Sequence, residues 1–156
     1  MKQDKNTFKP LQKNKKAYFN YEVLEDLECG IALVGTEVKS IREGKFSFTD
    51  SYVTVSGHSL TLVGLTIQPY THGSINNHDP ARNRRLLAHK DEIKRLKRKV
   101  DEKGFTLIPT SIYLRGNLVK VQVSLCRGKQ MHDKRNVIKE RDLNRDTRRE
   151  LKQMQY

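Results

Sequence analysis

The sequence predicts a mainly β fold with helices, in which a closed six-stranded β-barrel carries two or three flanking helices and a basic C-terminal tail. Three observations support this prediction. Short segments alternate apolar and polar residues with the period of two that is typical of half-buried strands. Two segments repeat apolar residues at helical spacing. Most of the formal net charge of +13 lies at the two ends of the 156-residue chain.

The first expected elements follow a basic N-terminal stretch. Phe19, Tyr21 and Val23 alternate with polar residues, and a second short apolar run covers residues 31–34. Thr36 can then cap a short helix that ends before Gly44. The sequence therefore predicts two strands and one helix before residue 45.

A hairpin and a second helix are expected in the middle of the chain. Residues 52–55 and 60–67 flank a Ser-Gly-His-Ser turn, and the polar residues 71–80 form a long loop. From about 90 to 103, Ile93, Leu96 and Val100 follow the spacing of one helix face. Gly104 comes directly after this segment, which is typical of a helix C-cap.

The clearest strand lies near residue 120, where four apolar residues alternate with three polar ones over 119–125. We expect the apolar residues to be buried and Lys120, Gln122 and Ser124 to face outward. A less regular strand over 105–113 precedes it. About six short strands and two helices in this length are typical of an OB-like barrel, a fold that commonly binds nucleic acid. Fold alone does not fix function.

The charge distribution favours a polyanionic partner. Residues 1–16 carry six lysines and one aspartate, and residues 127–156 carry ten basic and five acidic residues. Clustered Lys and Arg favour nucleic acid, because neutralising phosphates releases counterions. The composition divides the chain into a disordered basic extension at 1–13, a barrel at 14–128 and a basic tail at 129–156.

Other cellular settings have little support. The sequence contains no apolar run long enough to predict a membrane segment. Its polar N-terminus lacks the features of a secretory signal. Cys29 and Cys126 lie in apolar surroundings without metal-ligand spacing. They are expected to be buried thiols in a reducing cytoplasm.

No catalytic or metal motif is present, so we expect no enzyme activity, no cofactor and no metal site. The enzyme alternative is a small RNA nuclease that uses Asp79 and the arginines after it. Arginines clustered near a loop are more often phosphate contacts, and we assign Arg82, Arg84 and Arg85 to that role.

Six segments, in this order and spacing, resemble one family. They are NKKA at 14–17, ECGIAL at 28–33, GTEVKSIREGK at 35–45, DSYV at 50–53, RRLL at 84–87 and GKQMHDKR at 128–135. Together they resemble SmpB, the family of SsrA-binding proteins, over about residues 8–150. The departures are small: Cys29 stands where the family usually has Ala, Ala88 where Leu is common, and Gln130 where Lys is frequent.

The resemblance implies an OB-like barrel that holds the tRNA-like portion of transfer-messenger RNA. It also implies a tail that enters the ribosome at the decoding centre and mRNA channel of the small-subunit rRNA. Stalled ribosomes would thereby be rescued by trans-translation, with tagging of the nascent peptide. We expect a cytoplasmic monomer without membrane contact, whose tail is disordered alone and helical on the ribosome. The matching RNA-binding positions are Asn14, Glu28, Leu87 and Lys120, and the matching tail positions are Gly128, Lys129, His132, Asp133, Lys134 and Arg135.

Several of these residues have a structural alternative. Glu28 can accept a hydrogen bond from a base or a ribose, or it can cap the turn at Gly30. Asn14 suits a base or ribose contact, with Lys15 and Lys16 beside it for phosphates, or it belongs to a solvated linker.

The remaining positions also have both a binding role and an alternative without RNA. Lys120 suits a phosphate contact or a solvated face, and Leu87 can pack a helix onto the barrel or meet an unstacked base. His132 beside Lys134 and Arg135 is suited to stacking on a nucleobase, or it is a solvated tail residue. A ribosomal or translation-factor OB protein that binds rRNA directly is the other binding interpretation. Such a protein would have no reason to carry both the tail motif and the GTEVKS segment.

Overall fold

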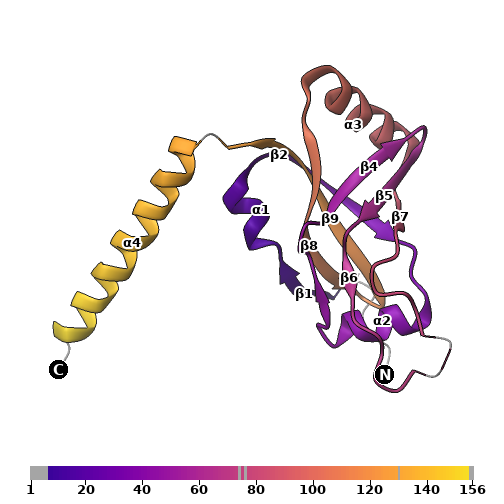
Figure 1. The fold of residues 1–156 in the computed structure, drawn as a ribbon, viewed down its shortest axis with the longest axis horizontal. Coiled ribbons are helices and arrows are strands. Elements are labelled where there is room, and N and C mark those ends of the chain that lie inside the picture. The colour runs from indigo at the N-terminus through magenta and orange to yellow at the C-terminus, as the bar shows by residue number, and fades with distance from the viewer. Residues whose placement is uncertain (1–6, 74, 76, 130, 155–156) are drawn as a thin grey trace.

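The computed structural model describes residues 7–73, 75, 77–129 and 131–154, which form nine strands and four helices (Figure 1). The strands are β1 (Phe8–Lys13), β2 (Tyr21–Ile31), β3 (Phe46–Ser47), β4 (Tyr52–Ser56), β5 (Ser59–Val63), β6 (Thr66–Ile67), β7 (Arg84–Leu87), β8 (Thr106–Arg115) and β9 (Leu118–Gly128). The helices are α1 (Lys15–Asn20), α2 (Gly35–Arg42), α3 (Lys90–Lys103) and α4 (Met131–Met154).

Seven strands form one antiparallel sheet in the order β1-β8-β4-β5-β7-β2-β9, and β9 pairs again with β8. The pairings of six strands therefore return to their starting point, with β1 added beside β8. The shortest links are β4–β8, through the single pair Val53 and Leu107, and β2–β7, through two pairs. The mainly β architecture with helices is confirmed. The strand pairings describe a ring, and they do not by themselves show a closed barrel.

The core lies inside the ring and uses alternate positions of each strand. Val119, Val121, Val123 and Leu125 are all buried, as their alternation predicts. Lys120 stands between them on the outer face and is half-buried. The register predicted for this strand is therefore confirmed.

The predicted helix at 90–103 is confirmed as α3, which lies at the end of the ring opposite α2 (Figure 1). It buries Ile93 and Leu96 in the core and ends at Gly104, whose φ of 64° is the left-handed geometry that favours glycine. Glu25 of β2 pairs with Lys99 at 2.5 Å and also with Arg95. These two ion pairs tie the exposed side of α3 to the sheet.

The N-terminal elements differ from the prediction. Residues 15–20 form helix α1, because the Asn14 side chain accepts a hydrogen bond from the Ala17 amide at 3.2 Å and caps the helix. Phe19, predicted in a strand, therefore lies on a helix. A single strand covers Tyr21–Ile31, and residues 32–34 only link it to α2. With α1 and α4 there are four described helices, against the two or three expected beside a tail.

The boundaries at the two ends can also be compared with the structure. Residues 8–13, expected in a disordered extension, pair with β8 as strand β1. The tail forms helix α4, which projects away from the sheet (Figure 1). Its disorder in free solution stays a prediction, and so does the division of the chain into three parts.

The outer face of β9 is not solvated throughout. Ser124 faces outward as predicted but is fully buried, where it bonds Thr110 at 2.8 Å and Asp26 at 2.5 Å. Cys126, the next outward position, packs under Ala17 of α1. Helix α1 therefore covers this end of the strand, a contact between distant segments that the alternation could not reveal.

Both cysteines are free thiols buried in the protein, as predicted. Burial raises the pKa of Cys29 to about 12 and that of Cys126 to about 11. Both therefore remain protonated at neutral pH and act as small apolar residues.

Candidate nucleic-acid interface

Strand pairing brings three of the predicted RNA-binding residues onto one outer face of the sheet. Gly30 of β2 lies opposite Leu87 of β7 on one side and Lys120 of β9 on the other. Lys120 lies in turn opposite Tyr113 of β8. We call Leu87, Gly30, Lys120 and Tyr113 the cross-strand row. Its members come from four strands that are far apart in the sequence.

Glu28 belongs to the same face, one step along the strands. It lies opposite Gln122 of β9, which lies opposite Ser111 of β8 and accepts a hydrogen bond from the Ser111 hydroxyl at 3.2 Å. Residues two apart on a strand share a face, so Glu28 and Gly30 point the same way. The outward direction is fixed by Leu27 and Cys29, which are buried in the core.

The absence of a side chain at Gly30 makes a hollow in the cross-strand row. A Cβ at this position would lie 3.2 Å from the Leu87 Cβ, so another residue would push Leu87 aside. Leu87, Lys120 and the exposed Leu118 border this hollow of about 280 Å³. It combines an apolar wall with a cation, which suits a base or ribose beside its phosphate.

The Glu28 carboxylate is partly exposed and already has two partners. It accepts a hydrogen bond from the Tyr113 phenol and pairs with Arg115 at 3.2 Å. Burial and the Glu28 hydrogen bond both raise the pKa of Tyr113, so the phenol stays protonated as a donor. Glu28 keeps 34% of its side chain exposed and can accept a further bond from a base or a 2′-hydroxyl. The alternative role, a cap for the turn at Gly30, does not apply because both residues lie within β2.

Asn14 has a structural role in this geometry. Its side chain is buried, caps α1 and donates to the Pro109 carbonyl at 2.9 Å. It is therefore not part of a solvated linker, and it acts on the surface by fixing α1. Lys15 and Lys16 on that helix are exposed, and Lys16 pairs with Asp50 at 3.5 Å.

The three arginines predicted to contact phosphates differ in their burial. Arg85 is exposed on the outer face of β7. Arg84 is fully buried, where it pairs with Glu37 at 2.5 Å and donates to the Leu65 carbonyl at 2.6 Å. Its assignment as a phosphate contact is therefore corrected, because no phosphate can reach this guanidinium in the folded protein. Arg82 is half-buried and also pairs with Glu37.

Glu37 holds these two arginines together inside the protein. Burial alone disfavours its charged form, but hydrogen bonds from Arg82, the Val34 amide and Arg84 outweigh that cost and lower the pKa of Glu37. The cluster is thus ionised at neutral pH. It fixes the loop before β7 rather than offering a binding group.

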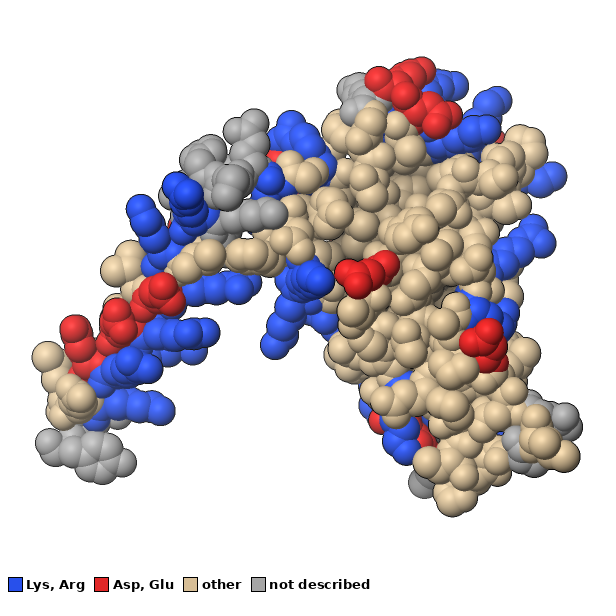
Figure 2. Space-filling view, in the orientation of Figure 1, with Lys and Arg blue, Asp and Glu red and all other residues tan. Residues whose placement is uncertain are grey.

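The tail begins beside α1 and then leaves the sheet. Gly128 ends β9, and Lys129 donates to the carbonyls of Asn20 and Tyr18, at 3.0 and 2.9 Å. Farther along, Arg141 lies 5.6 Å from the Phe19 ring. Figure 2 shows Lys and Arg side chains along α4 and where it meets the rest of the molecule. Arg135 is exposed, whereas the side chains of His132, Asp133 and Lys134 lie outside the described part of the chain.

Sequence reasoning missed part of the surface. Gln122 shares the alternation of Lys120, so that pattern could have identified it. Arg115 and the buried Tyr113, whose phenol donates to Glu28, reach this face only through the pairing of β8 with β9, for which the sequence carries no direct signal. Within the described ranges, no three His, Cys, Asp or Glu residues are grouped to hold a metal ion. The helices in these ranges also lack the length and apolar character of a membrane-spanning segment.

Comparison with known proteins gives consistent results. The family model described as SmpB protein matches residues 11–153. An SsrA-binding protein of Treponema denticola is 50% identical over 149 residues, which cover 96% of this chain and 97% of the relative. One of Aquifex aeolicus is 48% identical over 144 residues, which cover 92% of each chain. A solved chain described as "tmRNA-SmpB: a journey to the center of the bacterial ribosome" is 49% identical with a TM-score of 0.65, over 78% of this chain and 86% of that chain.

Proposed function

The chain belongs to the SmpB protein family, and on that premise we propose that it is the adaptor that binds transfer-messenger RNA for trans-translation. It holds the tRNA-like portion of that RNA and delivers it to stalled ribosomes. The ribosome is thereby rescued and the nascent peptide receives its tag. The relatives at about half identity over nearly the whole chain support this assignment.

The observation that carries the proposal is the joined outer face of β7, β2, β9 and β8. One face presents an apolar side chain at Leu87, a cation at Lys120 and a hydrogen-bond acceptor at Glu28. Structured RNA offers the matching groups, since an unpaired base stacks, a phosphate attracts the ammonium and a 2′-hydroxyl donates. The face is therefore the RNA-binding surface, with Lys15, Lys16 and Arg85 as further phosphate contacts.

The tail has a different role in the proposal. Its cations neutralise rRNA phosphates in the decoding centre and mRNA channel, which offsets the entropy lost when the segment becomes ordered. Helices in proteins are stabilised mainly by packing an apolar face, and α4 projects away from the sheet, so the tail is disordered alone and helical on the ribosome. The matching tail residues, Gly128 to Arg135, lie at its start, where His132 stacks on a base.

The proposal also covers the closure of the barrel, the location and oligomeric state of the protein, and its lack of catalytic activity. The ring of six strands is a closed OB-like barrel, in which the short β4–β8 link completes the circle. The protein acts as a cytoplasmic monomer and catalyses no step of its own. Incubating the purified protein with RNA, with and without divalent metal, tests the last point, and RNA cleavage would contradict it.

Truncation after Gly128 separates the two parts of the function. The truncated protein should bind the tRNA-like portion with nearly unchanged affinity in a gel shift, because the cross-strand row remains. It should fail to support peptide tagging on stalled ribosomes, because the tail is absent. Changing His132, Asp133, Lys134 and Arg135 together to Ala should block the same step.

The control is a full-length variant in which four cations of α3, Lys90, Lys94, Lys97 and Arg98, become Gln. It should retain tagging, because it removes positive charge from a helix outside the tail and outside the cross-strand row. Loss of RNA binding on truncation, or tagging that survives it, would contradict the proposed division between sheet and tail.

A further inference from the structure

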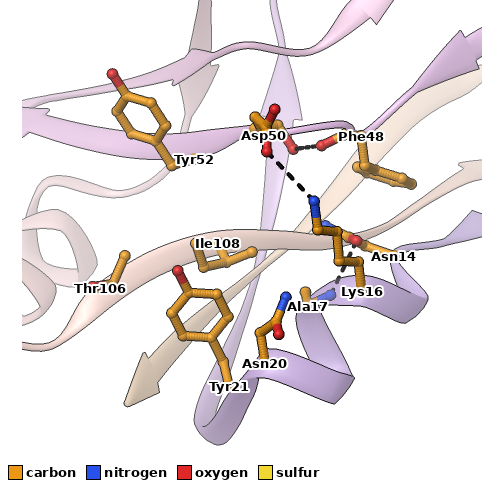
Figure 3. A pocket seen from close by; sticks show the side chains of 11 residues that line it. Asn14, Lys16, Ala17, Asn20, Tyr21, Phe48, Asp50, Tyr52, Thr106 and Ile108 are labelled. Carbon is orange, nitrogen blue, oxygen red and sulfur yellow. Dashed lines mark hydrogen bonds and ion pairs between the residues drawn. The ribbon is translucent and has the colours of Figure 1, made fainter. Parts of the chain in front are cut away.

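A pocket of about 320 Å³ lies between α1, the segment before β4 and the start of β8 (Figure 3). Tyr21 and Tyr52 lie on either side of Ile108 at its base, and Ala17 adds to the apolar floor. Tyr52 is 44% exposed, so its ring is accessible from solvent. The pocket is at the end of β8 opposite the cross-strand row, and none of the roles assigned above uses its two tyrosines.

Three polar groups in this pocket have no hydrogen-bond partner in the described part of the chain. Among the described residues, neither the Tyr21 phenol, the Tyr52 phenol nor the Asn20 side-chain amide makes a hydrogen bond. Each can donate and accept. Two aromatic rings, an apolar floor and free polar groups at the rim are the features that bind a flat, heteroaromatic ring with polar edges.

A second hollow of about 440 Å³ adjoins the pocket and shares Asn14, Lys16 and Phe48 with it. Lys13 and Lys15 also border this hollow, and both are exposed. Asp50 is the acidic residue at the boundary, and it pairs with Lys16 at 3.5 Å. Both side chains of that pair are well exposed, so the pair contributes little and can yield to a phosphate.

The frame around the pocket is fixed before any ligand arrives. Asn14 holds α1 against the Pro109 carbonyl. Opposite it, Asp50 adopts a φ of 56°, and the Ser51 hydroxyl donates to the Phe48 carbonyl at 2.6 Å. A Cβ at Gly64 would lie 2.8 Å from the Asp50 carbonyl oxygen, so the chain packs closely behind this turn. A preformed site loses little entropy on binding.

We propose that the pocket binds one unstacked nucleobase of single-stranded RNA, stacked on Tyr52, with the adjoining phosphates held over Lys13, Lys15 and Lys16. The inference deepens the proposed function, since it adds a base-binding site to the same RNA-binding protein. The RNA is either a looped-out nucleotide of transfer-messenger RNA or an unpaired nucleotide of rRNA, because both present the same base and phosphate. The stacking ring and the neighbouring lysines belong to one site.

The test uses the full chain and a single-stranded ribo-oligonucleotide that carries one 2-aminopurine, whose fluorescence falls when the base stacks. Tyr52→Ala should weaken binding about ten-fold and abolish the fluorescence change. Tyr52→Phe keeps the ring and should bind within about two-fold of the unchanged protein. Tyr18→Ala is the matched control, because Tyr18 is 39% exposed on α1, the helix that borders the pocket, but does not line the pocket.

Two longer RNAs then identify the source of the base. Gel shifts with the tRNA-like portion of transfer-messenger RNA and with a decoding-centre fragment of small-subunit rRNA should show a Tyr52→Ala effect on at least one. The inference is overturned if Tyr52→Ala binds all three RNAs normally, or if Tyr18→Ala loses as much affinity. A loss with Glu28→Ala but none with Tyr52→Ala would reject this pocket and leave the proposed function intact.

Discussion

Glu37 and Glu28 are two carboxylates with similar partners in opposite surroundings. Glu37 pairs with Arg84 and Arg82 and has no exposed side-chain surface. Glu28 pairs with Arg115 and accepts from the Tyr113 phenol, and a third of its side chain remains exposed. The first cluster lies inside the protein, behind β7, and the second lies on the outer face of β2 and β8.

The difference shows how burial decides what an ion pair does. When a buried ion pair loses one partner, the other charge stays buried without a counter-charge or water. A buried pair therefore cannot open to let one of its members bind a ligand. An exposed pair is screened by water and costs little to open. The Glu37 cluster therefore contributes to stability and the Glu28 cluster is available to RNA, although both consist of one acid and nearby donors.

The largest effect should come from breaking the buried cluster. Glu37→Ala leaves the Arg84 guanidinium buried without a carboxylate and should lower the free energy of unfolding by about 3–5 kcal/mol. Urea denaturation measures this change. Glu43→Ala is the control, because Glu43 at the end of the same helix is exposed and pairs with Lys45 at 3.1 Å. A Glu37→Ala loss no larger than that of the control would show that the buried cluster is not a stabilising unit.

Acid should weaken the same cluster without a mutation. The pKa of Glu37 is lower in the folded protein than its ordinary value of 4.5. Its contribution to stability is therefore fully present above that value and is lost as the pH falls through the folded pKa. Urea denaturation between pH 7 and pH 3 should show the unchanged protein approaching Glu37→Gln in stability. A constant difference across this range would contradict the assignment of a lowered pKa.

Loss of the exposed Glu28 carboxylate should affect RNA binding more than the stability of the fold. Glu28→Ala should weaken binding of the tRNA-like RNA by about 1–3 kcal/mol, because one acceptor is lost. It should change the free energy of unfolding by less than about 1 kcal/mol. Gel shift and urea denaturation on the same sample measure both. Glu22→Ala on the same strand is the control, since Glu22 pairs with Arg127 outside the cross-strand row. Equal losses of RNA affinity in the two variants would show that Glu28 makes no specific contact with the RNA.

The smallest expected effect concerns a single phosphate contact. Lys120→Ala should reduce the slope of log affinity against log salt by about one unit and leave stability nearly unchanged. Lys45→Ala serves for comparison, because its ammonium already pairs with Glu43. An unaltered slope for Lys120→Ala would mean that this ammonium meets no phosphate.

Local patterns predicted those elements whose signals lie within a few residues. The apolar spacing of Ile93, Leu96 and Val100, followed by Gly104, predicted α3 with its ends. The alternation over 119–125 predicted the buried face of β9, and the Gly57 turn predicted the β4–β5 hairpin. Helix α1 was missed because its six residues are too short for a helical period, and its cap depends on a carbonyl at Pro109 that is distant in the sequence.

Sequence patterns identified the inward positions of β9 and the ends of the chain that carry most of the charge. They also included motifs that resemble those of the family to which the chain belongs. Sequence patterns did not show what covers the outward positions of a strand, and the folded chain did. Ser124 and Lys120 alternate identically along β9, yet one is buried with Thr110 and Asp26 and the other borders the hollow at Gly30. Arg84 and Arg85 are neighbours, yet one pairs with buried Glu37 and the other is exposed. This difference arises because a strand fixes the direction of each side chain through local geometry, whereas burial depends on segments from elsewhere in the chain that pack against it.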